Sequence, residues 1–340
     1  MLIARSSPPA VPAPGANAAL ASLACQALAR AVSLSPLRKR LSILIYHRVL
    51  AAPDPLFPAE VDAQRFEQHL RYLKRSFNVI SLSEAVHGLR HDSLPPRAAC
   101  ITFDDGYADN AEIALPLLQR HALPATFFVA TGFLDGGRMF NDTVIELVRR
   151  APAQLDLTPL QLGRYTLDSW GSRRQAVGAL LDQLKYLPLA EREDKIAALT
   201  ELVGIALPDD LMMRTDQLRR LHAAGMEIGG HTVSHPILAR MSAAGARDEI
   251  AAGKAQLEQL IGAPVRLFAY PNGIPGQDYQ AEHVDIVRSL GFDAAVCTSW
   301  GAARPGGDLF QLPRFTPWNQ DQLRFTVRLM QNLARRGNTV

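Results

Sequence analysis

The chain has 340 residues, 48% of them hydrophobic, and a formal net charge of +3. This length suits one large domain with additions or two smaller domains. The basic residues are dispersed apart from the trio 38–40, so the composition excludes nucleic acid as an expected partner. Three widely spaced cysteines indicate neither a disulfide framework nor a cysteine-based metal motif.

The first forty residues differ in composition from the rest of the chain. Residues 1–15 are rich in Pro, Ser and Ala, which predicts a disordered tail, and residues 18–34 have the apolar spacing of a helix. This helix is too short and too polar for a membrane span, and it makes a poor signal peptide. We favour packing on the main domain. The alternative is peripheral contact with a membrane through residues 18–40, and the default location is the cytoplasm or the inner face of the membrane.

From residue 41 onwards, short apolar runs alternate with amphipathic segments. This rhythm predicts strands that pair in parallel with helices between them. The expected elements are strands at 41–49, 77–82, 98–103 and 125–130, and helices at 66–73, 84–89 with Ser83 as its cap, and 110–121.

The rhythm stops between residues 136 and 213, where the chain becomes charged and helical, as at 175–187 and 191–203. We interpret this segment as an insertion that either walls the substrate site or only buttresses the domain. Beyond it the expected elements are helices at 215–222, 242–261 and 281–290, and strands at 294–297 and 311–315.

Two adjacent carboxylates, Asp104 and Asp105, end the apolar run that begins at residue 98. Two ionised carboxylates side by side repel each other, so each needs its own partner. One can bind a metal while the other handles protons. The simpler alternative is a strand that ends in an Asp-Gly turn.

Two histidines, His231 and His235, follow an apolar segment at 226–228. On a helical turn, residues four apart share a face, so both imidazoles can reach one ion. Two imidazoles and one carboxylate would leave one coordination position of the metal ion open, as in catalytic zinc sites. Asp105 is our candidate for the carboxylate. A pair of histidines on a surface helix is the alternative.

Three motifs, at residues 102–106, 231–235 and 268–273, together resemble the polysaccharide deacetylase family. This family is carbohydrate esterase family 4, and its catalytic region is the NodB homology domain. The resemblance covers about 41–134 and 214–316. It implies a distorted (β/α)7 barrel, an α/β fold, over residues 41–340 with the insertion at 136–213. Barrel active sites lie at the carboxyl ends of the strands, where the sequence also places the motifs.

The resemblance also assigns roles to individual residues. It implies a general base, a divalent metal ion with three protein ligands, and a third motif that contacts the substrate or its oxyanion. Zinc is the expected ion, with Co²⁺, Ni²⁺ or Fe²⁺ as alternatives. The residues are Asp104 as base, Asp105, His231 and His235 as metal ligands, and Tyr270, Pro271 and Asn272 in the third motif.

The chain departs from the usual family pattern at residues 312–315, Leu-Pro-Arg-Phe, where many members carry a histidine that acts as general acid. His47 ends a predicted barrel strand, so we expect it to supply the acid. The chain is similar in this respect to enzymes of the poly-N-acetylglucosamine deacetylase type. Arg314 is our candidate for orienting Asp104, because a guanidinium holds a carboxylate in a fixed geometry. A surface or substrate contact is the alternative for Arg314.

The expected function is metal-dependent removal of N-acetyl groups from an N-acetylated sugar or polysaccharide, with a glycan or glycolipid as substrate. Hydrolysis of an amide requires activation of both the carbonyl and the leaving amine. Two alternatives remain, namely a metal-dependent amidase for a non-sugar cyclic amide and a non-catalytic carbohydrate-binding relic.

Overall fold

The structure is a computed structural model that describes residues 39–317 and 321–340. The tail at 1–15 and the helix at 18–34 that the sequence predicts lie outside these described residues. Within them, no helix combines the length and the apolar character that a membrane span requires.

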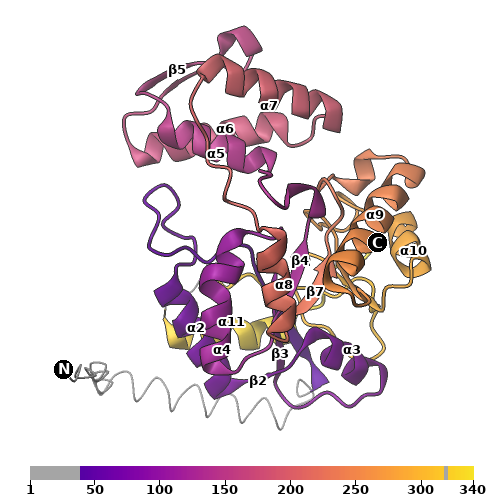
Figure 1. Cartoon of the computed structure of the whole chain (residues 1–340). Coiled ribbons are helices and arrows are strands. Elements are labelled where there is room, and N and C mark those ends of the chain that lie inside the picture. Colours follow the sequence, from indigo (N-terminus) through magenta and orange to yellow (C-terminus); the bar gives the residue numbers. More distant parts are fainter. Residues whose placement is uncertain (1–38, 318–320) are drawn as a thin grey trace, which may run out of the picture.

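A seven-stranded sheet forms the centre of the fold (Figure 1). Six strands follow the order β1-β3-β4-β7-β8-β9, β2 pairs with the start of β3, and every pair is parallel. All residues of the two longest strands are buried, which explains their continuous apolar runs. The strands are β1 Leu41–Tyr46, β2 Asn78–Val79, β3 Ala98–Phe103, β4 Thr126–Val129, β7 Glu227–Gly230, β8 Leu267–Ala269 and β9 Ala294–Val296.

The segment 311–315 connects the two edges of this sheet. The Leu312 N–H donates to the Ala295 carbonyl at 2.9 Å, and the Phe315 N–H donates to the Ile43 carbonyl at 2.7 Å. The segment therefore lies between β9 and β1, although it forms isolated bridges and not the regular strand that we predicted. The expected (β/α)7 barrel is confirmed.

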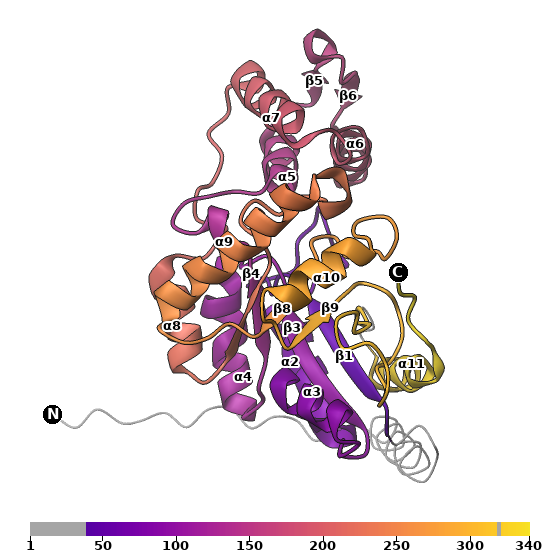
Figure 2. The ribbon, with the colours of Figure 1, turned by 90° about the vertical axis from the view of Figure 1, so that its right-hand side faces the viewer.

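Helices surround the barrel (Figures 1 and 2). They are α2 Ala63–Ser76, α3 Leu82–Arg90, the π-helix η2 Asn110–Ala114 continuing into α4 Leu115–His121, α8 Thr215–Ala223, α9 Ala243–Ile261, α10 Ala281–Ser289 and α11 Gln322–Ala334. The prediction of Ser83 as a cap is wrong, because the Ser81 hydroxyl accepts the Glu84 N–H and the Glu84 carboxylate accepts the Ser81 N–H. The expected strand at 77–82 is only two residues long.

The charged helical segment forms a separate layer beyond the ends of the strands (Figures 1 and 2). It has its own hydrophobic core, whose fully buried members include Val144, Leu180 and Leu199. We call this layer the roof. Its elements are α5 Phe140–Arg150, β5 Gln154–Asp156, β6 Arg164–Thr166, α6 Trp170–Leu184 and α7 Leu189–Val203.

Stacked aromatic rings fill the barrel core below the strand ends. The Phe103 ring stacks on Phe127 with centroids 4.7 Å apart and on Tyr46 at 5.4 Å, and Phe66 of α2 meets both Tyr46 and Phe103 edge-on. Phe103 is the residue directly before Asp104. Core packing therefore fixes the end of the strand from which the two carboxylates project.

Replacing Phe127 with Ala should lower the free energy of unfolding by about 3–5 kcal/mol, because it leaves a cavity at the centre of this stack. Urea unfolding of the two proteins measures the difference. Leu202→Ala is the control, since this side chain is 45% exposed and its loss should have little effect. A loss below about 1 kcal/mol for Phe127→Ala would show that the stack does not anchor the core.

Candidate active site

The candidate residues converge at the carboxyl ends of the barrel strands. His47 follows β1, Asp104 follows β3 and His231 follows β7, and all three line a cavity of about 460 Å³. Parallel strands in a barrel bring their carboxyl ends to one mouth, which explains why residues so far apart in sequence meet there.

The two adjacent aspartates face different partners because the chain turns between them. Asp105 adopts a φ of 75° and Gly106 a φ of 91°, so the extended strand ends at Asp104. Asp104 contacts Arg314, whereas Asp105 faces His231 and His235. We predicted separate partners for the two carboxylates because like charges repel. In the structure, the left-handed turn produces this separation.

Arg314 holds Asp104 through a bidentate ion pair. Its two Nη atoms each lie 2.6 Å from a carboxylate oxygen, and its Nε donates to the Cys297 carbonyl at 3.0 Å. Arg314 is fully buried and does not line the cavity, so the structure favours the pair with Asp104 over the alternative of a surface or substrate contact. Burial raises the pKa of Asp104, but the Arg314 charge and neighbouring His231 outweigh it, so that the pKa lies below its usual value. Asp104 is therefore held ionised.

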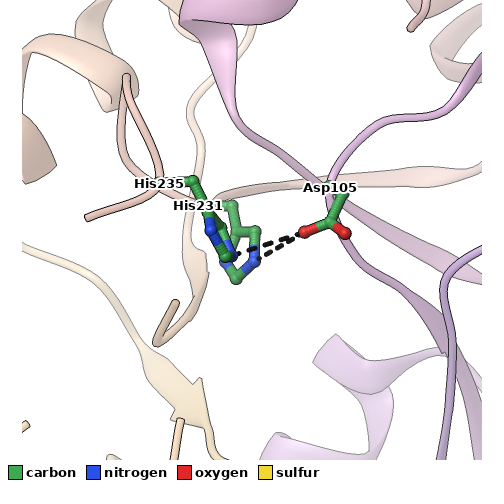
Figure 3. A group of neighbouring side chains, drawn as sticks. All are labelled: Asp105, His231 and His235. Atoms are coloured by element: carbon green, nitrogen blue, oxygen red, sulfur yellow. Dashed lines mark ion pairs between the residues drawn. The ribbon is translucent and has the colours of Figure 1, made fainter. Parts of the chain in front are cut away.

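Asp105, His231 and His235 form a group suited to a metal ion (Figure 3). The Asp105 Oδ1 lies 3.4 Å from the His231 Nε2 and 3.5 Å from the His235 Nε2. A tetrahedral zinc ion with bonds of about 2.0–2.1 Å separates its ligand atoms by about 3.3 Å, which agrees with both distances. The Asp105 Oδ1 is buried and makes no hydrogen bond within the described chain, so its lone pairs remain available.

Hydrogen bonding prepares His231 for this role. Its Nδ1 lies 2.7 Å from the Ala269 carbonyl, which can only accept, so Nδ1 carries the proton and Nε2 faces Asp105. Burial lowers the pKa of His235 to about 4, which keeps that imidazole neutral. The three side chains thus fit a divalent ion in both donor type and spacing.

The two histidines lie on a loop, so the predicted helical turn is wrong. Thr232 and His235 adopt φ values of 67° and 53°, which a helix does not allow. Glu249 of α9 holds the loop by accepting the Val233 and Ser234 N–H groups, both at 2.9 Å. A folded loop with an acidic clamp brings the imidazoles together in place of helical spacing.

His47 is exposed at the mouth, and the residues after the first motif hold its backbone. The Asn110 side-chain amide donates to the His47 carbonyl at 2.8 Å. Asp109 accepts the Arg48 Nε–H at 2.8 Å and the Val49 N–H at 3.1 Å. Our sequence analysis missed Asp109 and Asn110. Their only signal was polar character directly after the first motif.

The third motif places Asn272 at the cavity and Tyr270 away from it. Tyr270 is fully buried, its ring stacks on Tyr279 with centroids 3.9 Å apart, and its N–H donates to the Val296 carbonyl. Pro271 is also buried. Asn272 lines the cavity, and its N–H makes no hydrogen bond among the described residues. Contact with the oxyanion stays a prediction for this motif, and Asn272 has the free donor it needs.

The roof covers the cavity and is fastened on two sides. Arg149 of α5 pairs with Asp54 of the loop after β1 at 2.6 and 2.8 Å, and Tyr186 accepts a hydrogen bond from Gln277 at 2.5 Å. The roof residues that line the cavity are Met139, Phe140, Asn141, Asp142, Ile145, Arg149, Leu181 and Lys185.

Asp142 brings a buried carboxylate from the roof into the cavity. The Tyr107 hydroxyl donates to it at 3.1 Å, and burial raises its pKa to about 6. We did not predict Asp142 from the sequence, because helix α5 was not expected as a separate element.

Comparison with known proteins identifies the family of this chain. The model of the polysaccharide deacetylase family matches residues 91–156 and 188–295, about half of the chain. The chain therefore belongs to the polysaccharide deacetylase family. A curated candidate polysaccharide deacetylase, YxkH of Bacillus subtilis, is 33% identical over 92 residues, which are 26% of this chain. The aligned segment spans about a third of YxkH.

Solved structures of deacetylases share the fold. The deacetylase PplD of Streptococcus pyogenes, solved with acetate, is 20% identical with a TM-score of 0.57 over 86% of this chain and 98% of its own. IcaB of Ammonifex degensii is also 20% identical, with a TM-score of 0.58 over 86% and 97%. The deacetylase domain of BpsB from Bordetella bronchiseptica is 18% identical, with a TM-score of 0.52 over 82% and 96%. At these identities the likeness shows the fold alone.

Replacing Arg314 with Gln should destabilise the protein by about 3–5 kcal/mol near pH 7, because Asp104 is left as a buried unpaired charge. In the wild type the pKa of Asp104 is lowered, so the pair contributes stability above the ordinary carboxyl pKa and loses it as the pH falls through the folded pKa. In the variant, burial without the Arg314 charge raises the pKa of Asp104, so acid protonates this carboxyl and removes the unpaired charge. The difference between the two proteins should therefore shrink as the pH falls. Urea unfolding at neutral pH and near pH 4 measures this change.

A double variant, Arg314→Gln with Asp104→Asn, is the control for this interpretation. Removing the charge along with its partner should restore part of the lost stability. An equal loss at both pH values, or no recovery in the double variant, would mean that Arg314 stabilises the protein only by packing.

Proposed function

We propose that this protein is a metal-dependent deacetylase that removes N-acetyl groups from an N-acetylated glycan. The observation that carries the proposal is a three-donor group, Asp105, His231 and His235, beside the ionised carboxylate of Asp104. A divalent ion bound there would act as a Lewis acid toward the acetamide carbonyl and would make water more acidic.

Each neighbouring residue then has a defined task. Asp104 accepts the proton of the attacking water, and Arg314 fixes the orientation of its carboxylate. The free N–H of Asn272 donates to the oxygen that becomes negative. His47, exposed at the mouth, protonates the departing amine, because an amine anion is too poor a leaving group.

Two features favour catalysis over the binding-relic alternative. The donor set for the metal is complete, and the base has a buried partner that serves no evident purpose in a protein that only binds sugars. The cavity of about 460 Å³ has room for a sugar ring at the metal site. A cyclic non-sugar amide is a second substrate class, for which the structure holds no specific observation.

The two aspartates should respond differently to the same substitution. Asp105→Asn should lose the metal ion and activity together, because a ligand is removed. Asp104→Asn should keep the ion and lose acetate release by roughly 10²–10⁴-fold, because a base is removed. Acetate released from N-acetylglucosamine oligomers, and metal content by elemental analysis, are measured on the same samples.

Two controls test whether activity depends on the metal ion and on the class of substrate. Chelation should abolish acetate release and one equivalent of Zn²⁺ should restore it, with a cyclic imide as the comparison substrate. Full activity after metal removal, or hydrolysis of the imide with no acetate released from the oligomers, would refute the proposal. Equal metal loss in both variants would refute only the assignment of Asp104 as base and Asp105 as metal ligand.

Substitution of His47 tests the general acid. His47→Ala should bind metal normally and hydrolyse amides roughly 10²–10⁴-fold more slowly, whereas an activated aryl acetate should be affected far less, since its leaving group needs no proton. Asn110→Ala is the matched comparison for His47→Ala. It removes the hydrogen bond to the His47 carbonyl and keeps the imidazole. Equal losses on amide and ester would remove His47 from the mechanism.

A further inference from the structure

Three basic side chains meet where the roof contacts the barrel. Lys185 caps the end of α6, Arg192 lies on α7, and Arg240 ends the short 3-10 helix η5, Leu238–Arg240. They line a small pocket of about 20 Å³ together with Pro236. We call these three residues the basic cluster.

None of the three charges has an ion-pair partner within 4.0 Å in the described part of the chain. Glu193 is exposed and interacts with Arg192 only at longer range. Asp278 interacts weakly with Lys185, and its carboxylate accepts the Ile274 N–H at 2.9 Å. The basic cluster therefore has a surplus of positive charge at this junction.

Arg192 is the most buried member of the basic cluster, with an exposed fraction of 6%. Its guanidinium lies over the Phe140 ring with the central carbon 4.3 Å from the centroid, and its buried Nε has no hydrogen-bond acceptor. A ring face attracts the guanidinium charge but satisfies no in-plane donor. A buried N–H without an acceptor is costly, so an anion that accepts from the Arg192 Nε would stabilise this site.

The position of the basic cluster relates it to the catalytic cavity. Lys185 lines both the small pocket and the large cavity, and Pro236 directly follows the metal-site residue His235. About 20 Å³ accommodates roughly one water-sized group, so an oxygen atom of a larger molecule fits but a sugar ring does not. Guanidinium and ammonium groups together select oxyanions such as phosphate and carboxylate.

We propose that Lys185, Arg192 and Arg240 form an oxyanion subsite that binds a phosphate or carboxylate group of the glycan substrate. The inference rests on the proposed function and restricts its substrate class to glycans that carry a negative charge. The preferred substrate is an N-acetylated sugar that carries a negative charge beside the acetamide to be cleaved. The anion binds at the junction of roof and barrel while the acetamide lies at the metal site.

Binding of three related sugars tests this subsite. N-acetylglucosamine, its 1-phosphate and N-acetylmuramic acid, which bears a carboxylate, are titrated calorimetrically into the full-length zinc-loaded protein. At least one charged sugar should bind about 10-fold or more tightly than the neutral one, and the difference should shrink at high salt. A preference for phosphate or for carboxylate identifies the group.

The double variant Lys185→Gln with Arg240→Gln should abolish this preference and leave metal content unchanged. It avoids Arg192, whose replacement in the core risks unfolding the roof. Arg164→Gln is the matched control, because Arg164 belongs to the roof, is 73% exposed and lines neither cavity. This control should keep the full preference.

Inorganic phosphate separates failure of the subsite from failure of the proposed function. Phosphate that binds the wild type more tightly than the double variant supports the subsite, even if no sugar is deacetylated. Equal affinity of the wild type for neutral and charged sugars would overturn the inference, as would a preference that survives in the double variant. Either result leaves acetate release from neutral glycans as an independent test of function.

Discussion

The buried ion pair between Arg314 and Asp104 is the constraint on which the rest of this structure depends. Arg314 belongs to the segment that lies between β9 and β1, and Asp104 directly follows β3. One contact therefore links the last element of the barrel to the carboxylate that we propose as the base. An unpaired charge on either side would be expensive in this interior, so barrel closure and ionisation of Asp104 are coupled.

The left-handed turn at Asp105 completes this arrangement. It directs one carboxylate into the barrel interior and the next toward the two histidines. Without the turn, two negative charges would compete for the same cation. Asp104 and Asp105, our proposed base and metal ligand, are neighbours in sequence but have separate electrostatic environments.

Much of the fold was predictable from sequence, because the barrel strands are continuous buried apolar runs that end in polar residues. The same pattern identified Asp104, Asp105, His231 and His235 as candidates, with their roles implied by family resemblance. Residues that act through tertiary contacts could not be predicted from the sequence. Glu249 lies 14 residues beyond His235, and no local pattern marks it as the clamp of the histidine loop.

Other errors have equally specific causes. The spacing of His231 and His235 fits a helix, but positive φ values and the Glu249 clamp produce a loop. Helix α11 lies beyond the last motif and was missed because the prediction stopped at residue 315. The family resemblance implied Tyr270, Pro271 and Asn272 in the third motif as contacts of the substrate or oxyanion, and of the three only Asn272 lines the cavity.

The roof has a consequence for how this protein can change over time. Its helices are stabilised by a core separate from the barrel core, yet they supply much of the cavity lining. Substitutions on the cavity side of α5 and α6 can alter the shape of the cavity without disturbing the Asp104–Arg314 pair or the histidine loop. Ligand selectivity is thus free to diverge among descendants of this chain while these two features are inherited unchanged.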